Sequence, residues 1–255
     1  HLDFNINPWK KKKIFDLGDV ALPHANNNEK CIEDITNFYK IIAKKNKPVV
    51  SIGGDHSITG GILQGLGFNN LEMTKGQKIS FLHIDAHTDT FSQLDHFMGA
   101  KKSAAHWGAY LVEQGIIDPK TSMQIGMRGN PRTLDWLQPS YDLGYNVVTM
   151  DEFQKRGIED VIKELLDKIG DNPLYITFDL DSLDASVAPA VANIEPGFTG
   201  FTIDEAKALI QSVKNKNVIG GDVVCLMPTK DQKNNITSMV AASVMFEIIS
   251  VIAYK

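Results

Sequence analysis

The feature that most constrains the fold is a regular alternation of short apolar segments with longer amphipathic ones. The apolar segments are nearly continuous in hydrophobic residues, which is typical of strands covered on both faces. They span residues 48–53, 78–87, 123–128, 146–150, 174–181 and 218–226. Amphipathic segments with helical periodicity alternate with them, at residues 29–45, 57–66, 103–114, 131–143, 158–169, 203–214 and 236–253.

This alternation predicts an α/β fold in which helices cover both faces of a mostly parallel sheet. We therefore expect a single three-layer α/β/α domain over residues 1–255, a normal length for one such unit. In open sheets of this kind, ligands bind beyond the carboxyl ends of the strands. Polar residues that directly follow the apolar segments are the candidates for a functional site.

Composition and charge limit the classes of binding partner and the cellular compartment that we expect. The formal charge is −5 and no basic stripe is present, so we expect no nucleic-acid partner. No uninterrupted apolar run reaches the roughly 18 residues of a membrane span, and no segment resembles a secretory signal, so we expect no membrane partner. Cys31 and Cys225 are far apart and are interpreted as reduced, which suits a cytoplasmic protein. The chain opens with His1 rather than Met, which is consistent with a trimmed or incomplete N-terminus.

Three polar clusters follow apolar segments, at residues 51–57, 83–89 and 178–184. In an extended strand, side chains at i, i+2 and i+4 share one face. This spacing predicts that Asp85, His87 and Asp89 converge, and that Asp179 and Asp181 do the same. Four carboxylates so close together cannot all stay ionised without a compensating charge.

Divalent metal ions remove this conflict, and His56 after the first strand supplies a further ligand. Mixed carboxylate and imidazole ligands suit Mn²⁺, Fe²⁺, Co²⁺, Ni²⁺ or Zn²⁺. Six ligands fit two ions roughly 3.5 Å apart that share carboxylates. The alternative interpretation is that the aspartates cap helices and that His56 is a core histidine. The predicted metal ligands are His56, Asp85, His87, Asp89, Asp179 and Asp181.

The same segments resemble the signature motifs of the ureohydrolases, the family of arginase, agmatinase, guanidinobutyrase and formimidoylglutamase. The motifs are GGDHS at 53–57, DAHTD at 85–89 and FDLDSLD at 178–184. The likeness covers most of the chain. Residues 124–129, 142–144, 150–152 and 188–190 also fit and are most similar to agmatinases.

This resemblance implies an arginase-like fold and a binuclear manganese centre. His56, Asp85, Asp89 and Asp179 are expected to hold one ion, and Asp85, His87, Asp179 and Asp181 the other. Asp85 and Asp179 are then bridging ligands, and Asp89 also accepts the proton of the nucleophilic water. The implied reaction cleaves a C–N bond of a guanidine or amidine and releases urea and an amine, with agmatine-like substrates expected first. A homo-oligomer, a trimer or a hexamer, is implied in the same way.

One departure from the family lies in the last strand. Relatives have Asp-Val-Val-Glu there, and the Glu pairs with the substrate guanidinium. Here Cys225 follows Asp222-Val223-Val224, and a neutral thiol cannot form that charge-assisted pair. The alternatives are a formimidoylglutamase-type or other amidine hydrolase, a catalytically silent homologue, or another acid that reaches into the site.

A second departure lies at residues 103–108, where agmatinases carry a His-Gly-Thr segment. His106 is the candidate for the family's proton-shuttling, substrate-contacting histidine, and Trp107 for an apolar wall of the substrate site. The alternative places His106 on a helix surface and Trp107 in the core. His83, two residues before Asp85, is expected to have a supporting role only.

Overall fold

The structure is a computed structural model that describes residues 1–67, 72–94, 99–131 and 133–255. Its described strands form one sheet in the order β1-β6-β5-β2-β3-β4, and every neighbouring pair is parallel. The strands are β1 Val49–Ile52, β2 Ser80–Ile84, β3 Met123–Met127, β4 Asn146–Thr149, β5 Pro173–Asp179 and β6 Asn217–Val224.

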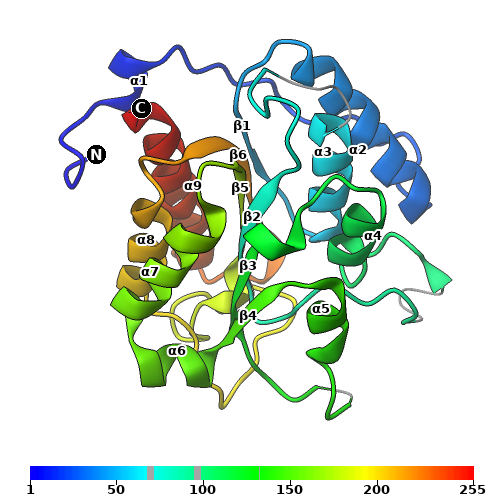
Figure 1. The fold of residues 1–255 in the computed structure, drawn as a ribbon, viewed down its shortest axis with the longest axis vertical. Coiled ribbons are helices and arrows are strands. Elements are labelled where there is room, and N and C mark those ends of the chain that lie inside the picture. The colour runs from blue at the N-terminus through cyan, green and yellow to red at the C-terminus, as the bar shows by residue number, and fades with distance from the viewer. Residues whose placement is uncertain (68–71, 95–98, 132) are drawn as a thin grey trace.

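Helices cover both faces of this sheet (Figure 1). One face carries α2 Asn28–Ala43, α3 Ser57–Gly67, α4 Trp107–Glu113 and α5 Gln138–Leu143. The other carries α6 Met150–Arg156, α7 Ile158–Ile169, α8 Ile203–Ser212 and α9 Ile236–Tyr254. The short helix α1 Pro8–Lys11 and the 3₁₀ turns η2 Pro119–Thr121, η3 Leu180–Ser182 and η4 Pro228–Lys230 complete the described elements. The predicted three-layer α/β/α fold is confirmed.

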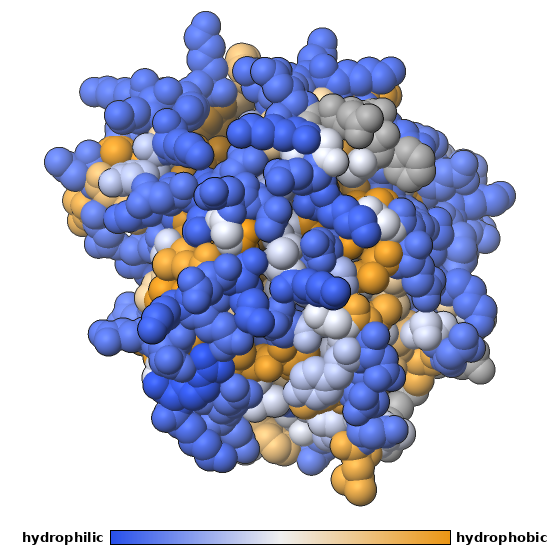
Figure 2. Space-filling model, viewed as in Figure 1, coloured by the Kyte–Doolittle hydropathy of each residue, from blue (hydrophilic) through white to orange (hydrophobic). Residues whose placement is uncertain are grey.

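Among the described helices, α9 is long and apolar enough to cross a membrane, judged by length and composition alone. In the structure one of its faces packs against β6 and α8 through Ala241, Val244 and Ile248. A core helix of this kind passes the same test, so the finding is weak evidence for a span. Figure 2 shows a mostly hydrophilic face of the molecule with scattered apolar residues.

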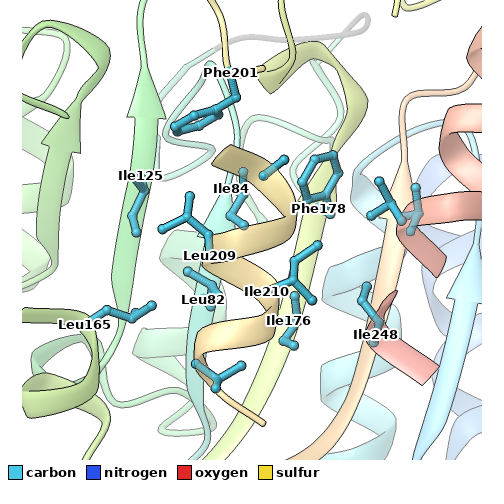
Figure 3. Close-up of a cluster of buried hydrophobic side chains, with 14 of the residues drawn as sticks. Leu82, Ile84, Ile125, Leu165, Ile176, Phe178, Phe201, Leu209, Ile210 and Ile248 are labelled. Carbon is cyan, nitrogen blue, oxygen red and sulfur yellow. The ribbon is translucent and has the colours of Figure 1, made fainter. Parts of the chain in front are cut away.

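The two-residue period of the strands divides the core into two layers. In β2, Leu82 and Ile84 face α8, whereas Phe81 faces α3 and α4. Figure 3 shows Leu209 and Ile210 of α8 packed over the even-numbered side chains of β2 and β5. Because both faces are covered, each strand must be apolar at nearly every position. This burial explains why the strand segments are recognisable in the sequence.

The chain reverses its direction of travel across the sheet between β2 and β5. From β2 it continues outward to β3 and β4, and from β5 it continues the opposite way to β6. Such a switch point leaves a crevice beyond the carboxyl ends of the two strands, where ligands bind in open α/β sheets. Asp85 directly follows β2 and Asp179 ends β5.

Several predicted boundaries were wrong. Helix α5 begins at Gln138 and not at residue 131, and α4 begins at Trp107 and not at residue 103. Arg132, within the predicted helix 131–143, lies outside the described residues. Helix α6 directly follows β4 and was missed, although Thr149 caps it by accepting from the backbone N–H of Glu152.

Candidate metal centre

All six predicted ligands come together at the carboxyl edge of the sheet, above the switch point. Asp85 and Asp179 stand between two sets of residues. We call the set around His56 the inner half; it comprises His56, His83, Asp89 and Trp107. We call the set around His87 the outer half; it comprises His87, Asp181, Glu195 and Cys225.

In the inner half, one nitrogen of His56 faces three carboxylates. His56 Nδ1 lies 3.0 Å from Asp85 Oδ2 and 3.1 Å from Asp89 Oδ2. Its distance to Asp179 Oδ2 is 3.2 Å, and the His56 side chain is only 1% exposed. Burial alone lowers the pKa of His56, but the carboxylates outweigh burial and raise this pKa well above its ordinary value.

The other nitrogen of His56 shows which one carries the hydrogen. His56 Nε2 lies 2.8 Å from Thr177 Oγ1, and this hydroxyl donates its own hydrogen to Asp222 Oδ1 at 2.7 Å. Thr177 therefore accepts a hydrogen from Nε2, which leaves the lone pair of neutral Nδ1 aimed at the carboxylates. His56 Nδ1 has no hydrogen-bond partner among the described residues, although it is fully buried. A buried lone pair that faces anions is tolerable only if a proton or a cation lies between them.

His83 supports Asp85 from behind. Gln124 Nε2 donates to His83 Nδ1 at 3.0 Å, so the hydrogen of the imidazole is on Nε2, 2.8 Å from Asp85 Oδ2. Burial raises the pKa of Asp85, but the neighbouring imidazoles of His56 and His83 outweigh burial and hold this pKa well below its ordinary value. His83 thus donates to a predicted ligand and orients it.

Asp89 is fixed by α4 and by its own backbone. Trp107 Nε1 donates to Asp89 Oδ2 at 2.9 Å, and the backbone N–H of Gly108 donates to the Asp89 carbonyl at 2.9 Å. A Cβ at Gly108 would lie 2.9 Å from that carbonyl oxygen, so the approach favours glycine. Asp89 adopts a left-handed φ of 52°. Such a backbone is uncommon for a residue with a side chain.

In the outer half, His87 contacts two aspartates and a third acid. His87 Nδ1 lies 3.4 Å from Asp85 Oδ1 and 3.3 Å from Asp181 Oδ2. Asp85 therefore faces His56 with one oxygen and His87 with the other. On the far side of the imidazole, His87 Nε2 lies 3.1 Å from Glu195 Oε1.

Glu195 is a candidate functional residue that the sequence reasoning missed. Its side chain is 21% exposed, and its hydrogen bond with His87 lowers its pKa. Its backbone has a left-handed φ of 47°. Gly129, whose left-handed φ of 103° favours glycine, lies against the Glu195 carboxylate. Glu195 is 108 residues from His87 in the sequence, so no local spacing pointed to it.

Arg128 is a buried cation beside these carboxylates, and the sequence reasoning did not anticipate it. Its guanidinium donates to the backbone carbonyls of Asp181, Ser182 and Leu183. These bonds hold η3 in place. Burial, together with the charges of Asp179 and Asp85, nevertheless raises the pKa of Asp181 well above its ordinary value.

Cys225 completes the outer half. It follows β6 with a left-handed φ of 65°, and its backbone N–H donates to the Gly54 carbonyl. Its sulfur and carboxylate oxygens of Asp179 and Asp181 all lie within 4.8 Å of one another. Burial, with the two carboxylates, raises the pKa of the Cys225 thiol well above its ordinary value. The thiol is therefore neutral unless a cation approaches it.

These residues fit a pair of divalent ions. Two groups of potential ligand atoms both include Asp85, and within each group all the atoms lie within 4.8 Å of one another. The first is His56, His83, Asp85 and Asp89, and the second is Asp85, His87 and Asp181. In the first group, Nδ1 of His56 has no hydrogen-bond partner among the described residues, so its lone pair is available to a metal ion. Carboxylate and imidazole donors suit Mn²⁺ and its neighbours in the first transition row.

The two other predicted site residues at the start of α4, His106 and Trp107, lie in the interior. Trp107 is fully buried and donates to Asp89, which is itself a predicted ligand. His106 is also buried, and its ring nitrogens lie 2.7 Å from Ser103 Oγ and 2.7 Å from the Leu94 carbonyl. The catalytic and substrate-binding roles of these two residues stay predictions.

The predicted reason for the convergence of the ligands was wrong. Strand β2 ends before the DAHTD segment, and β5 ends before η3, so the alternation of an extended strand does not align these side chains. Instead, the loop after β2 is tied to β3, where the Asp85 N–H donates to the Ile125 carbonyl at 3.2 Å. Two turns finish the arrangement: the His87 N–H donates to Asp85 Oδ1, and the Asp181 N–H donates to Asp179 Oδ1.

Known proteins are similar to this chain over nearly all of its length. The family model described as "Arginase family" matches residues 1–250. The chain belongs to the arginase family. It is 32% identical over 242 residues to a mitochondrial guanidino acid hydrolase of Homo sapiens, and the match covers 95% of this chain and 65% of that protein. It is 31% identical over 245 residues to a mitochondrial agmatinase of Gallus gallus, with coverage of 96% and 68%.

A solved structure extends the likeness to the fold. Proclavaminate amidino hydrolase from Streptomyces clavuligerus has a TM-score of 0.86 and 27% identity, and the match covers 98% of this chain and 79% of that one. The predicted ureohydrolase resemblance and arginase-like fold are confirmed. The prediction of a hydrolase of C–N bonds in linear amidines is confirmed at the level of the family. Because both named relatives are mitochondrial, a cytoplasmic location stays a prediction.

Proposed function

We propose that this arginase-family chain hydrolyses a C–N bond of a linear guanidine, with agmatine-like compounds as the leading substrates, and releases urea and an amine. The same hydrolysis of a linear amidine would release an amide in place of urea. The observation that carries the proposal is the shared Asp85 carboxylate, which faces His56 with one oxygen and His87 with the other. This arrangement suits two ions on either side of one ligand. The names of the relatives, agmatinase and guanidino acid hydrolase, support the substrate class.

The proposed cofactor is a pair of divalent ions, Mn²⁺ by family resemblance, held by the six predicted ligands. When bound, such a pair neutralises the carboxylates and lowers the pKa of a shared water to near neutrality. Asp89 is proposed to accept that proton, and Trp107 fixes the orientation of its carboxylate. Thr177 and Asp222 keep the hydrogen of His56 on Nε2, so that Nδ1 points into the site.

The outer half is proposed to meet the substrate. The side chains of His87 and Glu195 are 31% and 21% exposed, so this half is open to solvent. A guanidinium cation that approaches it meets carboxylates and is attracted to them. Cys225 is proposed to line this side of the substrate site. His106 is proposed to shuttle a proton to the leaving amine, and Trp107 to shape the site through Asp89.

Cys225 also supports a second candidate. Without the usual glutamate, that position offers no carboxylate for a bidentate pair with guanidinium. Hydrolysis of a formimino or other non-guanidine amidine depends less on that pair. A catalytically silent homologue, which keeps its metal site for stability, is the further alternative. We also propose a cytoplasmic homo-oligomer, a trimer or hexamer, that acts on a small molecule.

A product-release assay tests the proposal. The chain is loaded with Mn²⁺ and given arginine, agmatine, guanidinobutyrate or free guanidine, and formamide release from formiminoglutamate is measured in parallel. Urea from at least one guanidine supports the leading candidate. Formamide alone supports the second. If neither product forms although two ions are bound per chain, the proposed hydrolysis is wrong and the silent homologue is favoured.

A substitution separates the first two candidates. If the thiol is what limits guanidinium binding, Cys225→Glu should raise turnover of a guanidine substrate. Cys31→Ser is the matched control, because Cys31 lies in α2 with its thiol bonded to the His24 carbonyl. No gain for Cys225→Glu would show that the pocket is built for a different substrate.

A further inference from the structure

Cys225 is placed differently from an ordinary cysteine that lines a pocket. Its sulfur belongs to a compact group with carboxylate oxygens of Asp179 and Asp181, all within 4.8 Å of one another. Asp179 and Asp181 are both predicted metal ligands. The other cysteine, Cys31, takes part in no such group among the described residues.

A second observation marks the same place as a cation site. Asp179 belongs to the group around Cys225, and its Oδ2 lies 3.2 Å from His56 Nδ1. That nitrogen is buried and has no hydrogen-bond partner in the described part of the chain. The Cys225 thiol and the available lone pair of His56 Nδ1 therefore lie beside the same carboxylate, that of Asp179.

The backbone around Cys225 holds the thiol in this position. The residue has a left-handed φ of 65°. This conformation costs free energy for a residue with a Cβ. The hydrogen bond from its backbone N–H to the Gly54 carbonyl keeps it there. Gly54 lies two residues before His56, so the thiol and the inner half are fixed to the same segment.

The surroundings of the thiol are anionic, because the carboxylates of Asp179 and Asp181 lie beside it, and Cys225 is only partly exposed. A divalent ion that binds among these groups would take the sulfur as a thiolate, because a coordinating thiol is deprotonated outright. Two carboxylate oxygens and one sulfur are thus a suitable donor set for a cation.

We propose that Cys225 is a ligand of the metal ion in the outer half and that it binds this ion as a thiolate. On binding, the S–H bond breaks, the proton passes to solvent or buffer, and a sulfur–metal bond forms with no change of oxidation state. Thiolate ligands favour Zn²⁺ over Mn²⁺. Cys225 therefore shifts the metal preference of this chain away from Mn²⁺. The inference rests on the metal centre of the proposed function and sharpens its choice of metal.

Spectroscopy with Co²⁺ tests the ligand directly. The metal-free full-length chain is titrated with Co²⁺, and the visible ligand-field bands and the near-ultraviolet sulfur-to-cobalt charge-transfer band are recorded. The wild-type chain and Cys31→Ser should show both kinds of band. Cys225→Ser should keep the ligand-field bands and lose the charge-transfer band.

The two kinds of band separate failure of this inference from failure of the proposed function. Ligand-field bands without a charge-transfer band in the wild type would show a metal centre in which Cys225 takes no part. A charge-transfer band that persists in Cys225→Ser would overturn the inference in the same way. No ligand-field bands in the wild type would mean that the chain has no such centre, and the proposed function would fail with it.

Isothermal titration measures how far Cys225 changes the preference between two metals. Isothermal titration of the wild type and of Cys225→Ser with Zn²⁺ and with Mn²⁺ gives a ratio of affinities for each protein. We expect the Zn²⁺ affinity to fall by at least about 10-fold in Cys225→Ser and the Mn²⁺ affinity to change much less. Equal losses for the two metals would contradict a sulfur ligand.

Discussion

The two halves of the metal centre are built in different ways. The inner half is buried, and its polar groups are fixed by partners from the core, such as Trp107 for Asp89. In the outer half, the side chains of His87 and Glu195 are 31% and 21% exposed, and Glu195 and Cys225 lie in loops. This difference predicts which half tolerates substitution. We expect changes in the inner half to weaken metal binding most, and changes in the outer half to alter the preferred substrate or metal.

The largest effect is expected where the two halves meet. Asp179→Asn keeps the shape of the side chain but removes a charge that lies beside His56, Asp181 and Cys225. We expect both ions to be lost and activity to fall by more than about 100-fold, beyond the usual effect of a residue that only supports a ligand. Elemental analysis of the purified variant measures the metal content. A variant that retains two ions per chain would show that Asp179 does not join the halves.

Loss of the ions should also be visible as a loss of stability. Wild-type protein treated with a chelator and Asp179→Asn should both melt at a lower temperature than the metal-loaded wild type, because ions that bind only the folded state stabilise it. The melting temperature of the variant should not respond to added metal. A full response would contradict the role of Asp179.

The next largest effect is expected in the inner half. Trp107→Phe removes the N–H that donates to Asp89 Oδ2 at 2.9 Å and keeps most of the apolar volume. We expect metal affinity to fall by roughly 10- to 100-fold, as is usual when a partner of a metal ligand is removed. Trp9→Phe is the matched control, since Trp9 is exposed and stacks on Phe246. Equal affinities for Trp107→Phe and the wild type would place Asp89 outside the centre.

A smaller effect is expected from Glu195 in the outer half. Glu195→Ala removes the oxygen that lies beside His87 Nε2, and we expect about a 10-fold loss of metal affinity. Glu195→Gln keeps an accepting oxygen and should restore most of that loss if Glu195 fixes the tautomer of His87. The Michaelis constant of a cationic substrate should rise in both variants if the charge of Glu195 also attracts it. Identical metal binding by the Gln and Ala variants would contradict the tautomer role.

The smallest effect concerns the pH dependence of the metal-free protein. Burial lowers the pKa values of His56 and His87, but the surrounding carboxylates raise both well above the ordinary value of 6.5. A histidine with a raised folded pKa stabilises the fold below its unfolded pKa, and this contribution is lost as the pH rises through the folded pKa. The pKa of Asp181 is raised as well, so its contribution to stability is also lost as the pH rises above the ordinary value of 3.8. The pKa of Asp85 is lowered, so its contribution to stability has the opposite pH dependence and is lost at acid pH, as the pH falls through the folded pKa.

We therefore expect the melting temperature of the chelated protein to fall as the pH rises above about 6.5. His56→Asn should remove more of this slope than His87→Asn, because solvent screens the partly exposed His87. Thermal melts of the chelated proteins across neutral and alkaline pH measure both slopes. Equal slopes for the two variants would mean that solvent screens the charges of His56 and His87 equally.

The sequence by itself determined the layers of the fold and the six predicted ligands that the structure brings together at the candidate metal centre. The apolar strand segments are readable because burial on both faces leaves few polar positions in them, as in the fully buried β5. Asp85, His87 and Asp89 are readable because acidic residues and histidines gather directly after an apolar strand, where an open sheet binds its ligand. Boundaries were less certain, since the start of α4 and the end of β2 depend on contacts with other segments.

Only the tertiary structure decided how these residues meet and what supports them. The loop from Asp85 to Asp89 takes its shape from bonds to β3 and α4, and Glu195 reaches His87 from a distant part of the chain. The left-handed backbone at Cys225, which brings its thiol to the carboxylates, is equally invisible in a pattern of residue types. The physical reason is that packing and hydrogen bonds between distant segments select these partners, and no local period in a sequence records them.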